Sequence, residues 1–136
     1  MKQGIKILAV FITFLLCATC VVFARGMFDD MYPQAPQLLA PQSENIDLSG
    51  KDFLEFRWVP LTYALIDHYE FRLYSGNNTY GSNLVLKQDI APQESSFQAK
   101  SGLFETGKNY IWSLRLVNTR GIKGDIATDS FQIIKK

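Results

Sequence analysis

Three segments of this chain alternate apolar and polar residues with a period of two, and no other feature constrains the fold as strongly. They cover residues 53–59, 66–74 and 108–118. Successive side chains of a strand point to opposite faces of a sheet, so each segment is suited to bury one face and leave the other in water. In the part of the chain that contains these patterns, no segment has its apolar residues at helical spacing. We therefore predict an all-β domain.

The alternation assigns a face to each residue. In the first segment Leu54, Phe56 and Trp58 point one way, while Glu55 and Arg57 point the other. The same reasoning predicts these further core residues: Tyr69, Phe71, Leu73, Tyr110, Trp112, Leu114 and Leu116. It predicts these outward residues: His68, Glu70, Arg72, Ser113 and Arg115. Charge pairs across neighbouring strands on a wet face explain the outward glutamates without catalysis.

Shorter apolar runs, separated by turn residues, complete the pattern. The predicted strands cover residues 38–40, 53–59, 66–74, 84–90, 95–99, 108–118 and 126–134. Pro36 and Pro41 flank the first run, which suits an edge strand because proline cannot donate to a central ladder. Short strands at this spacing are typical of two packed sheets. The predicted fold class is a seven-stranded antiparallel sandwich of the immunoglobulin-like kind.

From Pro36 to Ile134 the chain resembles a fibronectin type III domain. The matching landmarks are Pro36 and Pro41 around the first strand, Trp58 on the second, Tyr69 on the third, Leu103 before the tyrosine-corner residue Tyr110, and Asn118 with Gly121 after the sixth. The chain departs from that family at residues 61–65, which are more apolar than its usual second loop. The resemblance supplies the strand order, and with the alternation it predicts a core built on Trp58, Tyr69, Leu103, Tyr110 and Trp112.

The first 24 residues have the pattern of an export signal. Lys2 and Lys6 precede an uncharged, mostly apolar run over residues 7–23, and Ala24 follows. Charge, apolar run and small residue in this order indicate a secretory signal peptide that is cleaved after Ala24. The mature chain would begin at Arg25 with 12 basic and 13 acidic residues, a net charge of −1.

Two other interpretations of residues 1–24 stay open. The apolar run approaches the length of a bilayer span, so the segment would then remain as an anchor. A lipid on Cys17 or Cys20 would tether the protein instead, although neither cysteine follows the usual small residue. In each case residues 25–35 form a linker and residues 36–136 the domain. The protein is expected outside the cytoplasm, where it is secreted, periplasmic or anchored to the outer face of the membrane.

The chain after residue 24 offers little catalytic chemistry. It has no cysteine, hence neither a disulfide nor a thiolate metal site, and His68 is its single histidine. A Ser-His-Asp arrangement would have to use His68, which the pattern places on a strand surface. No glycine-rich phosphate loop and no paired-histidine motif occurs. The net charge of +1 gives no indication of nucleic acid. We predict no enzyme activity, no cofactor and no metal.

In the fibronectin-like strand order three loops meet at one end of the sandwich, residues 60–65, 91–94 and 118–125. The first loop is apolar, while the third is basic and contains two glycines. An apolar patch beside adaptable polar groups suits recognition. The predicted binding residues are Leu61, Tyr63, Leu65, Arg120 and Lys123. The alternative is that the two leucines fold back and close the end of the core.

Three functions are compatible with these features. The leading hypothesis is an exported, non-catalytic interaction module whose partner is another envelope or extracellular protein. The second is a carbohydrate-binding module that stacks sugar rings on Tyr63, Tyr74 and Tyr80. The third is a small extracytoplasmic hydrolase that uses His68. Contact with a membrane is expected only through an uncleaved or lipidated N-terminal segment. Asn77 begins a glycosylation sequon, which matters only in a eukaryotic cell.

Overall fold

A computed structural model describes residues 32–62 and 65–136. Its strands are β1 (Leu38–Ala40), β2 (Glu44–Asp47), β3 (Phe53–Trp58), β4 (Ile66–Ser75), β5 (Leu84–Ile90), β6 (Ser96–Lys100), β7 (Asn109–Asn118) and β8 (Ala127–Lys135). Two short 3-10 helices, η1 (Gly81–Asn83) and η2 (Ser101–Leu103), lie in the connections. The predicted signal or anchor segment falls outside the described residues. Within the described residues, no helix has the length and apolar character needed to span a bilayer.

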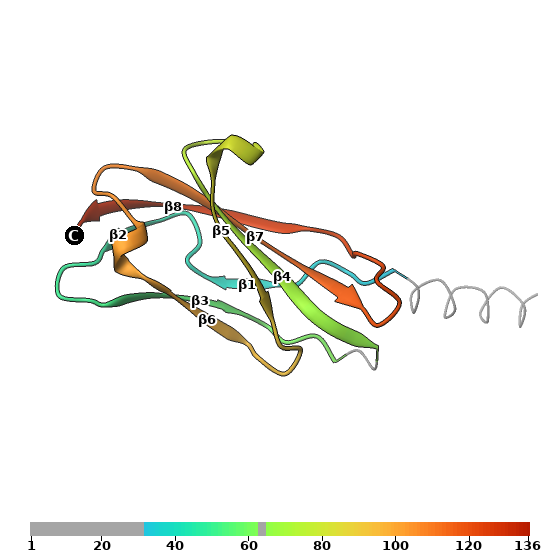
Figure 1. The fold of residues 1–136 in the computed structure, drawn as a ribbon. Helices are drawn as coiled ribbons and strands as arrows, with labels where there is room; N and C mark the ends of the chain where they lie inside the picture. The colour runs from blue at the N-terminus through green and yellow to red at the C-terminus, as the bar shows by residue number, and fades with distance from the viewer. Residues whose placement is uncertain (1–31, 63–64) are drawn as a thin grey trace, which may run out of the picture. The chain divides into compact units, whose positions relative to one another are not determined.

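The strands form two sheets that pack face to face (Figure 1). One sheet has the order β1-β3-β6 and the other the order β2-β8-β7-β4-β5. The prediction of an all-β, immunoglobulin-like sandwich is confirmed. The structure adds one strand to the seven predicted, because β2 pairs with β8, and this pairing is parallel rather than antiparallel. Of the four residues of β2 only Ile46 is buried, so the alternating pattern is too short to identify the strand from sequence.

Aromatic side chains from both sheets fill the core. Phe56 of β3 and Phe71 of β4 meet edge to face with ring centroids 4.9 Å apart, and Trp112 of β7 lies 5.1 Å from Phe56. Such pairs add to the stabilisation that apolar burial provides. Trp58 packs on Tyr69 in the same way, with centroids 5.6 Å apart. All five rings are buried.

The connection before β7 differs from the sequence prediction in which residue it buries. Tyr110 is buried, and its hydroxyl accepts a hydrogen bond from the backbone N–H of Glu105 at 2.8 Å, the geometry of a tyrosine corner. Leu103, expected in the core, is instead 38% exposed. The η2 turn points Leu103 outward and brings the next residue, Phe104, into the core against the Tyr110 ring. The expectation for Leu103 came from the family resemblance, and here its neighbour Phe104 fills the core instead.

The chain enters the domain at Pro33, three residues before the predicted domain start. The carbonyl oxygen of Pro33 accepts a hydrogen bond from the backbone N–H of Asp125 at 3.0 Å. Gly124 permits this approach, because a Cβ at that position would lie 2.3 Å from the same oxygen. The chain therefore enters the domain beside the loop between β7 and β8 (Figure 1).

Candidate binding surface

The loop after β7 is organised by one buried side chain. Asn118 is buried, and its Oδ1 accepts hydrogen bonds from the backbone N–H groups of Arg120 and Ile122, both at 2.9 Å. The positive φ of Gly121, 76°, suits the residue that allows this tight turn. The loop also touches its neighbour, since the N–H of Thr119 donates to the carbonyl of Leu65 at 2.8 Å. The first and third predicted loops therefore lie together.

The four predicted binding residues that the structure describes do not form a single site. Leu61 is half-buried against the core, and its N–H donates to the Tyr69 hydroxyl at 3.0 Å, so it helps to close the end of the sandwich. Leu65 is 38% exposed, and Arg120 is exposed at the tip of the third loop. Tyr63 lies outside the described residues. Lys123 turns away from this end and reaches the outer face of the five-stranded sheet.

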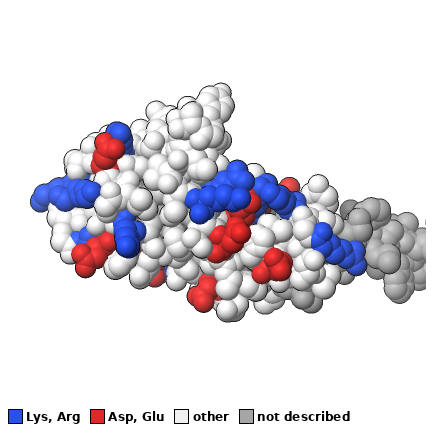
Figure 2. All heavy atoms as spheres, viewed as in Figure 1, with Lys and Arg blue, Asp and Glu red and all other residues white. Residues whose placement is uncertain are grey.

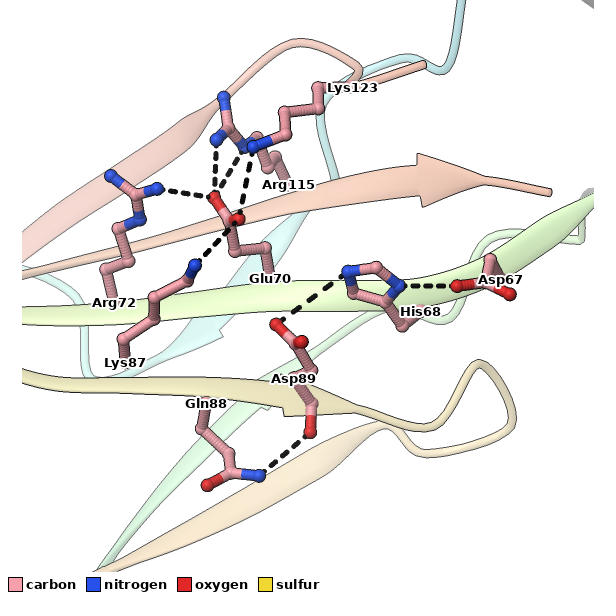
Figure 3. Close-up of polar contacts among 9 residues, drawn as sticks. All are labelled: Asp67, His68, Glu70, Arg72, Lys87, Gln88, Asp89, Arg115 and Lys123. Atoms are coloured by element: carbon pink, nitrogen blue, oxygen red, sulfur yellow. Dashed lines mark hydrogen bonds and ion pairs between the residues drawn. The ribbon is translucent and has the colours of Figure 1, made fainter. Parts of the chain in front are cut away.

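Lys123 joins a cluster that sequence reasoning did not predict, which we call the Glu70 cluster. Four cations converge on the carboxylate of Glu70 (Figure 3). Arg72 and Arg115 donate to Oε1, at 2.9 Å from Nη2 and 2.8 Å from Nε respectively. Lys87 and Lys123 lie 3.6 and 3.5 Å from Oε2. These side chains come from β4, β5, β7 and the loop after β7, which the sheet order brings side by side.

Glu70 is 4% exposed although it points away from the core. Burial alone would raise the pKa of its carboxyl group. The hydrogen bond and charge of Arg115, together with the charges of Arg72 and Lys123, outweigh that effect and lower the pKa to about 2. Glu70 is therefore ionised at neutral pH. One carboxylate faces four cations, so the cluster keeps an excess of positive charge.

His68 borders the cluster on the same strand. Its Nδ1 lies 2.7 Å from a carboxylate oxygen of Asp67, and its Nε2 lies 3.7 Å from one of Asp89 (Figure 3). The hydrolase hypothesis needs His68 to face a nucleophilic hydroxyl. Both ring nitrogens face carboxylates instead. Among the described residues no group of three or more histidine, cysteine, aspartate or glutamate residues is arranged to hold a metal ion.

Of the tyrosines proposed for sugar stacking, the structure describes Tyr74 and Tyr80, which differ in exposure. Tyr80 is 71% exposed beside η1, as expected for a loop aromatic. Tyr74, expected near the surface, is only 5% exposed. It lies in β4 opposite Ile111 of β7 and Leu84 of β5, so strands flank it on both sides. The prediction of exposure for Tyr74 was wrong because strands β5 and β7 lie on both sides of it, which the pattern along β4 alone does not indicate.

The outer face of the five-stranded sheet thus presents a positive patch. Figure 2 shows lysine and arginine side chains gathered across the middle of the visible face, with acidic side chains beside them. Arg72, Lys87 and Lys123 are a third to a half exposed, while Arg115 is more deeply set. Alternation along each strand did place Glu70, Arg72 and Arg115 on this face. Alternation contains no information on the register between neighbouring strands, and so the convergence was missed.

Comparison with solved structures identifies the architecture. The third fibronectin III domain of human KIAA0343 protein is similar with a TM-score of 0.55 and 14% identity, over 79% of this chain and 87% of that one. The fibronectin III domain of human contactin 1 gives a TM-score of 0.51 and 12% identity, over 74% and 79% respectively. The resemblance to the fibronectin type III fold is therefore confirmed. No family model and no curated protein sequence matches the chain.

Proposed function

We propose that this protein is an exported, non-catalytic protein-interaction module that recognises its partner through the outer face of the five-stranded sheet. The observation that carries the proposal is the Glu70 cluster, in which four cations are held in place on an exposed sheet face. Side chains that are already ordered lose little entropy on binding, which favours recognition. The signal pattern of residues 1–24 supports a location outside the cytoplasm.

This face suits recognition better than the loop end does. Leu61 packs against the core, and the chain enters the domain beside the loop end through the contact of Pro33 with Asp125. Lys123 of the basic loop already lies on the sheet face, where its Nζ is 3.5 Å from Oε2 of Glu70. Because Tyr74 is buried, the carbohydrate alternative now depends on Tyr80 and on Tyr63, which lies outside the described residues.

Site-specific photo-crosslinking in the native host tests the proposal. A photoreactive amino acid replaces Thr128, which is exposed next to Ser113 on the proposed face, or Gln98, which is exposed on β6 of the other sheet. We expect a defined protein adduct from position 128 and little from position 98. Equal labelling at the two positions would contradict the choice of face, and adducts at neither would contradict the module function.

The mass of the protein from the same cells tests export. A soluble species that begins at Arg25 is the expected result. A membrane-bound species could instead retain residues 1–24 or carry a lipid on Cys17 or Cys20. That result would mean that the domain is tethered to the membrane, still outside the cytoplasm. A full-length species in the cytoplasm would overturn the export proposal.

A further inference from the structure

We propose that the Glu70 cluster binds an acidic segment of the partner protein, with carboxylate side chains as the recognised groups. This inference rests on the proposed function and specifies the chemistry of the partner. The cluster is an exposed array of cations from three adjacent strands and one loop, fixed around a single carboxylate. Its geometry and its surplus charge both select a negatively charged ligand.

The donors of the cluster exceed what Glu70 can accept. A guanidinium has five N–H donors and an ammonium has three, whereas a carboxylate has about four lone-pair sites. Arg72, Arg115, Lys87 and Lys123 therefore retain donors after they have met both oxygens of Glu70. The exposed fractions of Arg72, Lys87 and Lys123, between 33% and 51%, make these donors accessible from the solvent side.

The surplus charge is local to this face. Residues 32–136 contain eleven basic and eleven acidic residues, so the domain as a whole is neutral. Within the Glu70 cluster four cations face one anion. A charge excess that is concentrated on one face of a neutral domain attracts and orients a partner of opposite charge.

A short acidic protein segment fits the boundaries of the cluster better than an extended polyanion. Asp89 lies opposite Glu70 on β5, and Asp67 lies beside His68 at the end of the cluster. A sulfated glycan or a nucleic acid laid along this face would meet these two carboxylates. One or two glutamate or aspartate side chains of a short segment could reach the four cations without lying along these two carboxylates. Arginine forks also bind carboxylates in a bidentate manner.

Glu70 has the role of a positioning residue in this arrangement. It holds the four cations at fixed points and does not itself contact the acidic segment. Replacing it with glutamine gives opposite predictions for two mechanisms. Attraction by charge alone would strengthen binding, because the Glu70→Gln variant is more positive by one charge. Binding to prearranged cations would weaken, because the cations lose the carboxylate that orders them.

Fluorescence anisotropy with short labelled peptides tests the inference on the full chain at low salt. The probes are a peptide of alternating glycine and glutamate, the matched peptide of glycine and glutamine, and a short heparin oligosaccharide. We expect the glutamate peptide to bind and the glutamine peptide not to bind. Arg72→Gln and Lys123→Gln should each weaken binding about three- to tenfold, the range for a lost charge-assisted contact.

Matched variants on the other sheet control for net charge. Arg57→Gln and Lys100→Gln remove the same charge from exposed residues of β3 and β6 and should leave the affinity unchanged. Equal weakening by these controls, or preferential binding of the heparin oligosaccharide, would overturn the inference. Tighter binding by Glu70→Gln would overturn the positioning role. If that variant does not fold, the two pairs of glutamine variants on the two sheets still decide the proposal.

The photo-crosslinking result separates this inference from the proposed function. An adduct at position 128 without binding of the glutamate peptide means that the face binds a protein by other contacts, and only the acidic-segment inference fails. Absence of adducts at both crosslinking positions removes the module function as well.

Discussion

The tripeptide Glu-Phe-Arg occurs twice in this chain, as residues 55–57 in β3 and residues 70–72 in β4. Both phenylalanines are fully buried, and their rings meet across the core. Both glutamates point away from the core, yet Glu55 is exposed and Glu70 is buried. The same local sequence thus produces the same facing but two different environments. What surrounds a residue on its face depends on the neighbouring strands.

The neighbours of the two copies explain the difference. Glu55 lies opposite Gln98 of β6, and β1 is too short to reach its other side. Its nearest cation is Arg57 of its own strand, with the Nε atom 3.9 Å away and both side chains half exposed. Glu70 belongs to a strand flanked by β5 and β7, both of which contribute long basic side chains. Burial of Glu70 therefore comes from long-range pairing.

The largest expected losses of stability come from the buried phenylalanine that both copies of the tripeptide contain. Phe56→Ala and Phe71→Ala should each lower the free energy of unfolding by about 3–5 kcal/mol, because each leaves a cavity in the core. Urea denaturation measures both. The double variant should lose less than the sum of the two, since the rings touch. A loss under about 1 kcal/mol for either variant would mean that the two copies are not equivalent on their inner faces.

Substitution of the two glutamates should destabilise the protein by different amounts in the two copies of the tripeptide. Glu70→Gln removes the buried anion that four cations share and should cost about 2–3 kcal/mol, because the clustered cations lose their counter-charge. Glu55→Gln should cost less than about 0.5 kcal/mol, as expected of an exposed ion pair. The comparison uses urea denaturation at neutral pH. Equal losses for the two variants would show that burial of Glu70 has no energetic consequence.

The facing of these residues could be predicted from the sequence because strand alternation is a local property. The alternation placed Trp58, Tyr69 and Trp112 inward and Glu70 outward, and the structure has the same facing. The predictions for Leu103 and Tyr74 were wrong, because the η2 turn points Leu103 outward and β5 and β7 flank Tyr74 on both sides. Alternation along one strand contains no signal for such a turn or for the strands that lie beside it.

The Glu70 cluster could not be predicted because its members are far apart in the sequence. Arg115 lies 45 residues from Glu70 and Lys123 lies 53 residues away. Only the pairing of β4 with β5 and β7 brings them together. The fibronectin-like strand order implied those pairings. The register, which sets Glu70 opposite Arg115, was the missing information.

Acidification should distinguish the two glutamates in a second way. The pKa of Glu70 in the folded protein is about 2, below its ordinary value of 4.5, so the unfolded chain takes up the proton first as the pH falls. The stabilisation from ionised Glu70 is complete above about pH 4.5 and is lost progressively towards about pH 2. The melting temperature of the wild type should therefore fall more steeply over this range than that of Glu70→Gln.

Glu55→Gln is the control for the acid experiment and should follow the wild-type curve. Parallel curves for the wild type and Glu70→Gln would mean that the cations do not stabilise the Glu70 carboxylate. The remaining carboxylates are common to all three proteins, so the difference between the curves is the informative quantity.

The smallest effects are expected from the arginines of the two copies. Arg72→Gln should cost about 1 kcal/mol, since its Nη2 donates to Glu70 at 2.9 Å but three other cations stay on that carboxylate and water reaches the side chain. Arg57→Gln should cost less than about 0.5 kcal/mol, because it loses only a long contact in solvent. Thermal melts at low and high salt measure both. A larger loss for Arg57→Gln would mean that neighbouring strands do not determine the energetics of the two copies. In Arg72→Gln a loss that disappears in high salt would show that the Arg72 contact is screened like a surface pair.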